Sequence, residues 1–548
     1  DPYTGEIIGI AFAWGKGKAM QLDASTMIHN WDVVKEFLSS HTKQIYANQL
    51  FDRTFIAVQK QTPSHCWWDV QDAMGLIYSP LPRKLDFLRS IYTDIAPYKD
   101  VYKAAAGGKY RPEKLSALEL ARLNCLDVDV TLQVQQAQVG YIPEATIDFV
   151  RKQQQMAYEM RLLGCHIDTQ RLAGHYAMLI PQIEALENEF LDKYEVSISS
   201  PEQLSGLLYN KLGFNPPSSA LTNKQTGKQR KYPSTDEKTI QELAHSCGLI
   251  YLNDDEGERF EGESQYKDVL SSILIYRGLC KLSATYCEGT FKQIKADGRV
   301  HPVWKVLGTP NGRWSCVSPA LQTYPKHMRN IVKAGEGKIL FGADYKGIQI
   351  IGAGVLAEDW ELVDNMMRPG YSLHDETMEA IRPSWPSIKK VQAKAVVFGT
   401  FFGRSPRDIA YTFHVPVKVA EAWQEAFYNN RPKLRDFFEV KITNEFKSKG
   451  CLTLLDGRTV HYDKITEAKA APAQNFEATV VKSALWKLRE EGYKTILDIH
   501  DQIVVEEPDD DNKEDRYKRF IDIMETARPD LLKRIPVVGG MGYYWDEV

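Results

Sequence analysis

The sequence lacks the cysteine pairs that mark a structural zinc site or a disulfide framework. Its eight cysteines form no CxxC pair and no metal-ligand spacing, which indicates a reducing compartment and small core side chains. The chain also has no apolar run of membrane length and no cleavable signal, so we expect a soluble intracellular protein with no membrane partner. The chain begins abruptly at Asp1, which leaves open whether a further segment precedes it.

An excess of positive charge is also missing. Lysine and arginine number 68 against 72 aspartates and glutamates, a formal charge of −4. This excludes a globally basic nucleic-acid binder, so any such site must be local. No internal repeat is visible, and 548 residues are enough for about three or four domains.

Hydrophobic patterning changes along the chain. Residues 1 to about 135 alternate strand-like and helical runs and predict an α/β domain. From about 146 long amphipathic helices follow, the second opening with Thr169 as N-cap, and a basic loop (222–235) and an acidic loop (253–265) interrupt the helical part. Strand character returns near 338–345 and 453–462. We therefore expect one sheet assembled from separated segments around a helical insertion.

Two carboxylates stand at predicted strand ends. TILDIHDQIVVEE (495–507) reads as a β-hairpin with His500, Asp501 and Gln502 at its tip, and Asp344 ends the strand KILFGA. Each aspartate alone has an ordinary structural explanation, as a turn residue or a helix N-cap. On neighbouring strands, however, they would form a hard-oxygen site for Mg²⁺. Two such ions roughly 3.5–4 Å apart catalyse phosphoryl transfer.

A third motif is KVQAKAVVFGTFFG (390–403). Lys390, Lys394, Phe398 and Phe402 recur every four residues, which predicts two cations and two rings along one helix face. Such a face can hold a triphosphate and support a base and sugar, although exposed lysines over core phenylalanines would give the same pattern. The glycines after the two rings indicate that something approaches closely.

The order ADYKGIQI, KVQAKAVVFGTFFG and IHDQIVVEE closely resembles the motifs DYSQIELR, RxxxKxxxFGxxYG and HDE of the family A DNA polymerases, the DNA polymerase I group. GTPNGRWSCVSPALQTYP (308–325), ILIYRGLCKLSATY (273–286) and APAQNFEATVVKSAL (471–485) are similar to its TGRxSSxxPNLQNIP segment, its thumb-to-palm helix and its TPIQGxAADIIK helix. Upstream, YANQLFD and NCLDVDVT are similar to motifs of its 3′–5′ exonuclease domain. The resemblance covers essentially the whole chain and displaces the turn-residue interpretation of Asp501.

The resemblance implies that Asp344 and Asp501 hold two Mg²⁺ ions, for which Mn²⁺ could substitute, with help from the main-chain carbonyl of Tyr345. Lys394 would contact the incoming triphosphate and protonate the leaving pyrophosphate, and Lys390 would stand where the family has arginine, without its bidentate fork. The resemblance also implies that Phe398 contacts the nucleotide sugar, Phe402 the nascent base pair and His374 the phosphates. The primer-template minor groove would be contacted by Arg313, Gln322 and Gln474. His500 would lie beside the primer terminus. Minor-groove acceptors are alike in both base-pair orientations, so Arg and Gln can test pairing without reading sequence.

The sequence departs from the family pattern at the nucleotide site. Gln349 and Phe402 replace a glutamate and a tyrosine that surround the sugar's 2′ position, so we hypothesise that Gln349 blocks a 2′-hydroxyl by bulk, with weaker discrimination. Gln502 replaces the glutamate of HDE and removes one carboxylate, but we expect activity to survive on Asp344 and Asp501. Phe398 in place of tyrosine predicts poor use of dideoxynucleotides.

The exonuclease motifs are incomplete. Asn48 and Asp52 match the second motif and Asp127 the third, but Leu123 stands at the position of a tyrosine. The first motif, a DxE pair, belongs immediately before DPYTGEIIGIAF and is absent from this chain. Two carboxylates alone would hold two ions poorly, so we expect little or no proofreading.

The implied fold class is an α/β and α+β multidomain protein, with a right-hand polymerase fold of palm, fingers and thumb after an RNase H-like 3′–5′ exonuclease-type domain. The expected boundaries are 1–137 for the exonuclease-like domain, 138–300 for the thumb, 301–350 for the first palm part, 351–450 for the fingers and 451–548 for the second palm part. The expected activity is template-directed DNA synthesis by a monomer, with primer-template DNA and dNTPs as partners, in the cytoplasm of a bacterial or phage-infected cell or in an organelle. A single-subunit RNA polymerase and a catalytically silent nucleic-acid-binding protein remain alternatives.

Overall fold

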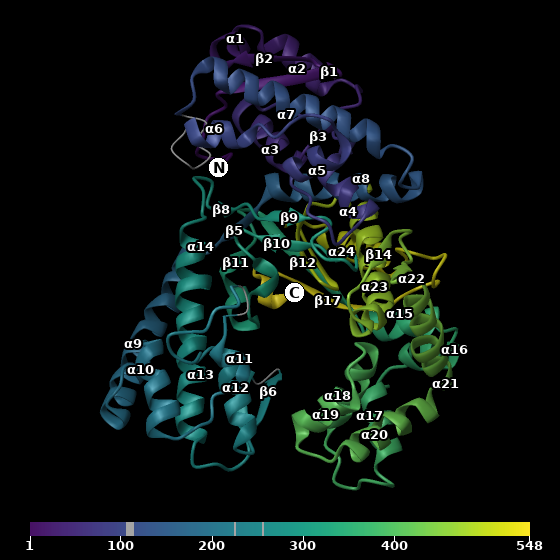
Figure 1. Cartoon of the computed structure of the whole chain (residues 1–548). Coiled ribbons are helices and arrows are strands. Elements are labelled where there is room, and N and C mark those ends of the chain that lie inside the picture. Colours follow the sequence, from purple (N-terminus) through teal and green to yellow (C-terminus); the bar gives the residue numbers. More distant parts are fainter. Residues whose placement is uncertain (106–113, 224–225, 255–256) are drawn as a thin grey trace. The chain divides into compact units, whose positions relative to one another are not determined.

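The computed structural model describes residues 1–105, 114–223, 226–254 and 257–548 (Figure 1). Two compact units make up the chain. The first comprises Asp1–His166, Lys295–Tyr371 and Pro432–Val548, and the second comprises Ile167–Ile294 and Ser372–Arg431. Two residues each of the expected basic and acidic loops, 224–225 and 255–256, lie outside the described part.

A four-stranded sheet lies at the centre of the first unit. Its strands are β12 (Lys338–Tyr345), β15 (Thr495–Ile499), β16 (Gln502–Pro508) and β17 (Val537–Gly542), in the order β15-β16-β12-β17. Every neighbouring pair is antiparallel. Most residues of β12, β15 and β16 are buried, as continuous apolar runs require of a sheet covered on both faces. The prediction of one sheet from separated segments is confirmed for 338–345 and 495–507. It is wrong for 453–462, where β13 (Cys451–Thr453) and β14 (Thr459–His461) form a separate two-stranded sheet.

The hairpin between β15 and β16 has a two-residue loop, His500 and Asp501. His500 has a φ of +61°, the left-handed conformation that tight hairpins use at a loop position. The predicted hairpin is therefore confirmed, with one correction. Gln502 is not at the tip, because it already pairs with Ile499 as the first residue of β16.

Two helices pack closely beside this sheet. Helix α15 (Ile348–Leu356) follows β12, and the long helix α23 (Ile465–Glu490) precedes β15. A Cβ at Gly352 would lie 2.5 Å from ring carbons of Phe476, so the helices approach to a distance that only glycine permits. This contact fixes the middle of α15 against the middle of α23.

The remaining elements of the first unit are short strands, and helices of various lengths. The strands include β1 (Gly9–Gly15), β2 (Lys18–Asp23), β3 (Ile45–Tyr46), β4 (Trp68–Asp69), β8 (Arg299–Val300), β9 (Val303–Lys305), β10 (Ser315–Val317), β11 (Val332–Lys333), β13 (Cys451–Thr453) and β14 (Thr459–His461). The helices include α3 (Gln49–Lys60), α6 (Lys99–Ala105), α7 (Ala117–Gln138), α8 (Glu144–Leu163), α16 (Trp360–Met366), α22 (Thr443–Lys449), α24 (Lys513–Glu525) and the 3₁₀ helices Lys326–Ile331 and Trp545–Glu547.

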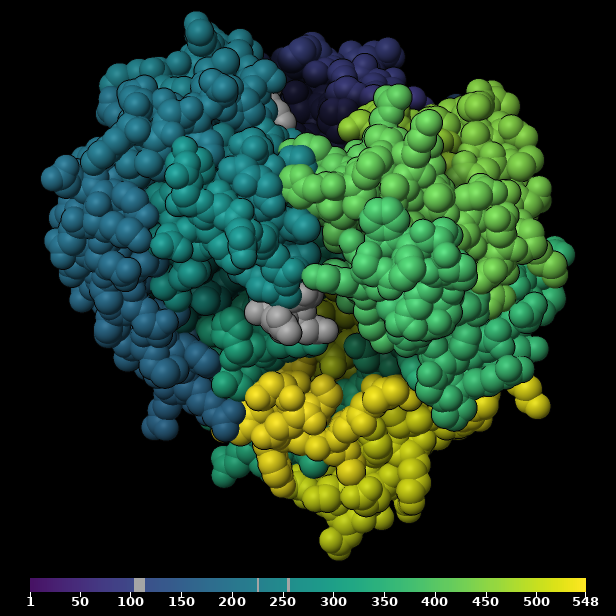
Figure 2. Space-filling model, turned by 90° about the horizontal axis from the view of Figure 1, so that it is seen from below, coloured from purple at the N-terminus to yellow at the C-terminus, as the bar shows by residue number. Residues whose placement is uncertain are grey.

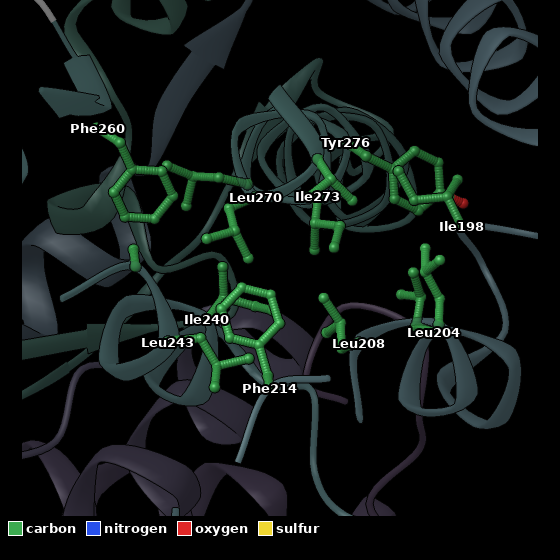
Figure 3. Packing of buried hydrophobic residues seen from close by; sticks show 14 of the residues in the cluster. Ile198, Leu204, Leu208, Phe214, Ile240, Leu243, Phe260, Leu270, Ile273 and Tyr276 are labelled. Carbon is green, nitrogen blue, oxygen red and sulfur yellow. The ribbon is translucent and has the colours of Figure 1, made fainter. Parts of the chain in front are cut away.

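The second unit is mainly helical. Its elements include α9 (Thr169–Tyr194), α12 (Glu237–Ser246), β6 (Ile250–Asp254), β7 (Gly257–Glu261), α13 (Lys267–Lys281), the π-helix Leu282–Glu288, α17 (Leu373–Ile381), α18 (Lys390–Phe401), α19 (Pro406–Phe413) and α20 (Val417–Asn430). Figure 3 shows the apolar core that joins α12, α13 and β7, where Ile240, Phe260 and Ile273 meet Leu208 and Phe214. The predicted N-cap of α9 is wrong by one residue, because the Asp168 carboxylate accepts from the main-chain N–H groups of Gln170 and Arg171.

The C-terminal part of the chain reaches the surface on the face drawn in Figure 2, where it is yellow. Val538 and Tyr543 within it are 64% and 51% exposed. In the described ranges, no helix combines the length and the apolar character needed to cross a membrane. All eight cysteines are free; three are buried and five half-buried, so the expectation of core cysteines holds fully only for Cys165, Cys287 and Cys316.

Candidate active site

The fold brings Asp344 and Asp501 together. Asp344 lies opposite Gln502 in the β12–β16 ladder, and the main-chain N–H of Tyr345 donates to the main-chain oxygen of Asp501 at 3.1 Å. The two carboxyl groups are joined directly, with Asp501 donating a hydrogen bond to Asp344. Two acids that are distant in the chain therefore form one pair at the end of the central sheet.

The surroundings of this pair disfavour two negative charges. Burial, then the charges of Asp344 and Glu477, raises the pKa of Asp501 to about 8. Burial also raises the pKa of Asp344, against the opposing effects of Asp501 and Arg329. Such a pair holds a proton until a cation replaces it. Because Asp344 is exposed at the surface, a cation from solvent can reach it.

Arg329, which the sequence analysis did not single out, lies close to both aspartates. Burial lowers its pKa, and the charges of Asp344 and Asp501 oppose that shift. Its guanidinium stacks over the Trp545 ring at 4.6 Å. One positive charge from the 3₁₀ helix Lys326–Ile331 thus partly balances the two acids. Sequence signals for it were weak, because a single arginine in a 3₁₀ helix is not distinctive.

Glu477 is a second residue that sequence reasoning missed. It lies on α23 with no exposed surface and accepts hydrogen bonds from Nε and Nη2 of the Arg313 guanidinium, at 2.7 and 2.6 Å. The side-chain amide of Gln349, in the first turn of α15, donates to the same carboxylate at 2.8 Å. Aligning APAQNFEATVVK with TPIQGxAADIIK would have revealed a glutamate at an alanine position.

The other expected primer-template residues also lie in the first unit. The Gln322 amide donates to the main-chain oxygen of Asp498 at 2.9 Å, and the Gln474 side-chain oxygen accepts from Asn311 at 2.9 Å. His500 lies at the hairpin tip, where the residue keeps exposed surface. The partial loss of solvent around its ring, and then the charge of Arg313, lower its pKa. The Gln322 and Gln474 side chains are therefore each held by a hydrogen bond, and His500 directly precedes Asp501 in the chain.

Gln502 has a structural explanation. Its side-chain N–H donates to the main-chain oxygen of Val548 at 3.0 Å, and its side-chain oxygen accepts from the Trp545 indole at 2.9 Å. An amide can donate and accept in this way, whereas an ionised carboxylate can only accept. The residue thus joins β16 to the C-terminal segment, and Asp501 is the carboxylate that this motif contributes beside Asp344.

In the second unit, helix α18 presents the expected side chains together. The Phe398 and Phe402 rings are parallel, with centroids 5.8 Å apart, and His374 lies 5.1 Å from Phe398. Burial, then the charges of Lys394 and Lys390, lowers the pKa of His374, which places both lysines near it. The Lys390 ammonium pairs with Asp375 at 2.8 Å, a solvent-exposed contact that a phosphate could replace at little cost.

The two glycines of this motif have ordinary structural reasons. A Cβ at Gly399 would lie 3.3 Å from Arg404 and from Ile409, so Gly399 allows α19 to pack on α18. Gly403 has a φ of +68° just after the helix, the usual position of a C-terminal glycine. The predicted close approach is therefore confirmed for Gly399, where Arg404 and Ile409 approach, whereas Gly403 is explained by its left-handed conformation.

The acids expected in the N-terminal region also lie close together. Burial, then the charge of Asp127, raises the pKa of Asp52 to about 7. Asp127 is bound by the Tyr98 hydroxyl and pairs with the Lys99 ammonium at 3.0 Å. Leu123 is buried and Asn48 precedes α3 with a φ of +71°. A lysine thus already neutralises one of the two acids.

A metal would bind best at the Asp344–Asp501 pair. Within the described ranges, no three His, Cys, Asp or Glu side chains are grouped to hold an ion by themselves. Mg²⁺ does not need such a group, because it usually binds through one or two carboxylates and takes its other ligands from water and phosphate. Two adjacent carboxyl groups with raised pKa values, one exposed (Asp344) and one half-buried (Asp501), fit that chemistry.

Comparison with known proteins shows the family of the chain. The model of DNA polymerase family A matches residues 169–547. DNA polymerase I of Geobacillus stearothermophilus is 28% identical over 411 residues, covering 69% of this chain and 43% of that protein. DNA polymerase I of Borreliella burgdorferi is 23% identical over 574 aligned positions, covering 96% and 59%. The chain therefore spans about half the length of these relatives.

The POL domain of Pol1 from M. smegmatis, solved in complex with DNA primer-template and dNTP, has a similar fold. Its TM-score is 0.77 at 17% identity, and the match covers 100% of this chain and 94% of that one. The fold is thus that of a polymerase domain. The chain belongs to DNA polymerase family A, whose members are generally dependent on divalent metals, and the predicted family is confirmed.

Proposed function

We propose that this chain is a template-directed DNA polymerase that adds dNTPs to a primer 3′ end. The observation that carries the proposal is the meeting of Asp344 and Asp501 at one end of the central sheet, with pKa values raised by burial. A pair that cannot easily carry two charges alone is suited to bind divalent cations together with a phosphate.

In this proposal Asp344 and Asp501 hold two Mg²⁺ or Mn²⁺ ions with the Tyr345 main-chain carbonyl. Bound there, the ions would lower the pKa of the attacking 3′-hydroxyl and stabilise the leaving oxygen. Lys390 and Lys394 bind the triphosphate through charge-assisted hydrogen bonds, and Lys394 gives a proton to the leaving pyrophosphate.

Other residues hold the substrates. Phe398 and Phe402 offer their parallel rings to the sugar and the nascent base pair, and His374 adds a phosphate contact. Arg313, Gln322 and Gln474 contact minor-groove acceptors, whose similarity in all base pairs suits an enzyme that copies any sequence. His500 contacts the primer terminus.

Primer extension tests the proposal. A labelled DNA primer on a DNA template is incubated with Mg²⁺ and either dNTPs or NTPs, with wild type, Asp501→Asn and Asp511→Asn. Asp511 is an exposed acid just beyond β16 and serves as the matched control. We expect template-directed extension with dNTPs by wild type and the control only. Equal extension with NTPs would favour an RNA polymerase, and DNA binding without extension would favour a silent protein.

We further propose that residues 1–137 form an exonuclease-like domain with little or no proofreading. The support is the Lys99–Asp127 ion pair at 3.0 Å, which occupies a carboxylate that a metal would need. We also propose the boundaries of thumb, fingers and palm that the resemblance implies. A phage or viral origin of the chain is a further part of the proposal.

A further inference from the structure

Glu477 carries one negative charge in a fully buried place. Its side chain has no exposed surface, and its two oxygens accept three hydrogen bonds, two from Arg313 and one from Gln349. A buried carboxylate needs such partners, because burying an unpaired charge is very costly. The network therefore fixes the side chains that it joins.

The three residues come from three separate elements. Arg313 lies two residues before β10, Gln349 is in the first turn of α15, and Glu477 lies at the middle of α23. The close Gly352–Phe476 contact sets the separation of α15 and α23. The network thus lies on a rigid base next to the aspartate pair, whose members both experience the charge of Glu477.

Glu477 also determines which way the Gln349 amide faces. Because a carboxylate only accepts hydrogen bonds, the Gln349 nitrogen must point toward it. The Gln349 oxygen then points elsewhere, and it is buried without a hydrogen-bond partner among the described residues. The Glu477 carboxylate therefore fixes the orientation of the Gln349 side-chain amide.

We propose that Glu477 is a positioning residue for nucleotide addition, because it orients Arg313 and Gln349. In this role Glu477 replaces the glutamate that the family has at position 349. The inference rests on the proposed function. Its geometric basis is that Gln349 and the outer Arg313 nitrogen bind the same oxygen of Glu477. A carboxylate at 349 would therefore also meet Arg313.

A double-mutant cycle tests this exchange of positions. The variants are Glu477→Ala, Gln349→Glu and the double variant, which has the family's residues at both positions. Glu477→Ala leaves Arg313 without its partner, and Gln349→Glu sets two carboxylates side by side. We expect each single variant to lower kcat/KM for dNTP addition on the order of a hundredfold. The double variant restores one carboxylate for one arginine and should recover to within about fivefold of wild type.

Glu506 provides a matched control. It is a buried carboxylate on β16 that accepts two hydrogen bonds from Arg299, at 3.1 and 3.0 Å, and one from the Gly335 N–H. Glu506→Ala should lower the melting temperature but keep kcat/KM within about threefold, with no recovery on adding Gln349→Glu. If Glu477→Ala does not fold, Glu477→Gln, which keeps the volume, should show the same loss of kcat/KM.

The outcomes separate the two claims. Wild-type extension abolished by Asp501→Asn supports the proposed function, and recovery in the double variant then supports the role of Glu477. A double variant no more active than the weaker single variant, or Glu477→Ala as active as wild type, would overturn the role of Glu477 alone. A wild-type protein that extends no primer would overturn both.

Discussion

The main-chain N–H of Tyr345 donates a hydrogen bond to the main-chain oxygen of Asp501 at 3.1 Å. This bond continues the β12–β16 ladder by one step beyond Asp344 and Gln502. It therefore determines which loop residue lies beside Asp344. A two-residue hairpin keeps that register, because its loop has no spare residue to absorb a slip.

The pH dependence of stability follows from the raised pKa of Asp501, about 8. Protonated Asp501 stabilises the folded state. This contribution to the free energy of unfolding is complete below the ordinary aspartate pKa of about 4 and is lost as pH rises through about 8. Without metal, the free energy of unfolding of wild type should therefore fall as pH rises, whereas that of Asp501→Asn should not. The difference in favour of the variant should reach about 1–2 kcal/mol at pH ~9, after allowance for solvent screening. Urea unfolding in EDTA at several pH values measures it. A difference between the two proteins that does not change with pH would contradict this, as would the same gain in Asp511→Asn.

Restoring the family's glutamate at position 502 should harm the protein. Gln502→Glu removes the donor to the Val548 oxygen and puts a carboxylate against it. We expect a loss of about 1–3 kcal/mol in the free energy of unfolding. Denaturant titration tests this, with Gln170→Glu in the exposed first turn of α9 as control, where an acid is favourable. An unchanged midpoint for Gln502→Glu would show that the amide contacts add nothing.

Chain terminators probe Phe398. Its ring lacks a hydroxyl that could replace the missing 3′-hydroxyl of a dideoxynucleotide, so wild type should discriminate strongly against ddNTPs. Phe398→Tyr should raise their relative incorporation by about tenfold or more, the worth of one hydrogen bond. Phe402→Tyr, one turn later, is the control. Efficient termination by wild type would refute the assignment of Phe398.

Mismatched primers probe the N-terminal region. With Lys99 bound to Asp127 at 3.0 Å, we expect no measurable removal of a mismatched 3′ nucleotide in the absence of dNTPs. Gel analysis of a labelled mismatched primer over time provides the measurement. Rapid shortening that is lost in Asp127→Asn would instead demonstrate a working exonuclease.

The central sheet and the aspartate pair could be predicted from the sequence, because long apolar runs and ordered motifs carry strong local signals. KILFGADY became β12 (Lys338–Tyr345) and the hairpin closed at Asp501 as expected. Helix ends were less certain, since Asp168 and Thr169 are both good N-caps and only the coordinates show which accepts the hydrogen bonds.

The partners of polar residues could not be predicted. Glu477 lies far from Gln349 in the chain and meets it only because Gly352 lets α15 approach α23. At Gln502 the sequence showed only the loss of a carboxylate, whereas the structure shows that its amide bonds to Trp545 and Val548. Such contacts depend on three-dimensional packing and leave no periodic signal in the sequence.

The most direct test of the account is the single-turnover rate of dNTP addition by Asp501→Asn on a bound primer-template with saturating Mg²⁺. If Asp344 and Asp501 hold the catalytic ions, this rate should fall by about a thousandfold or more while DNA affinity changes little. A rate within about tenfold of wild type would contradict the assignment of the catalytic centre to this pair.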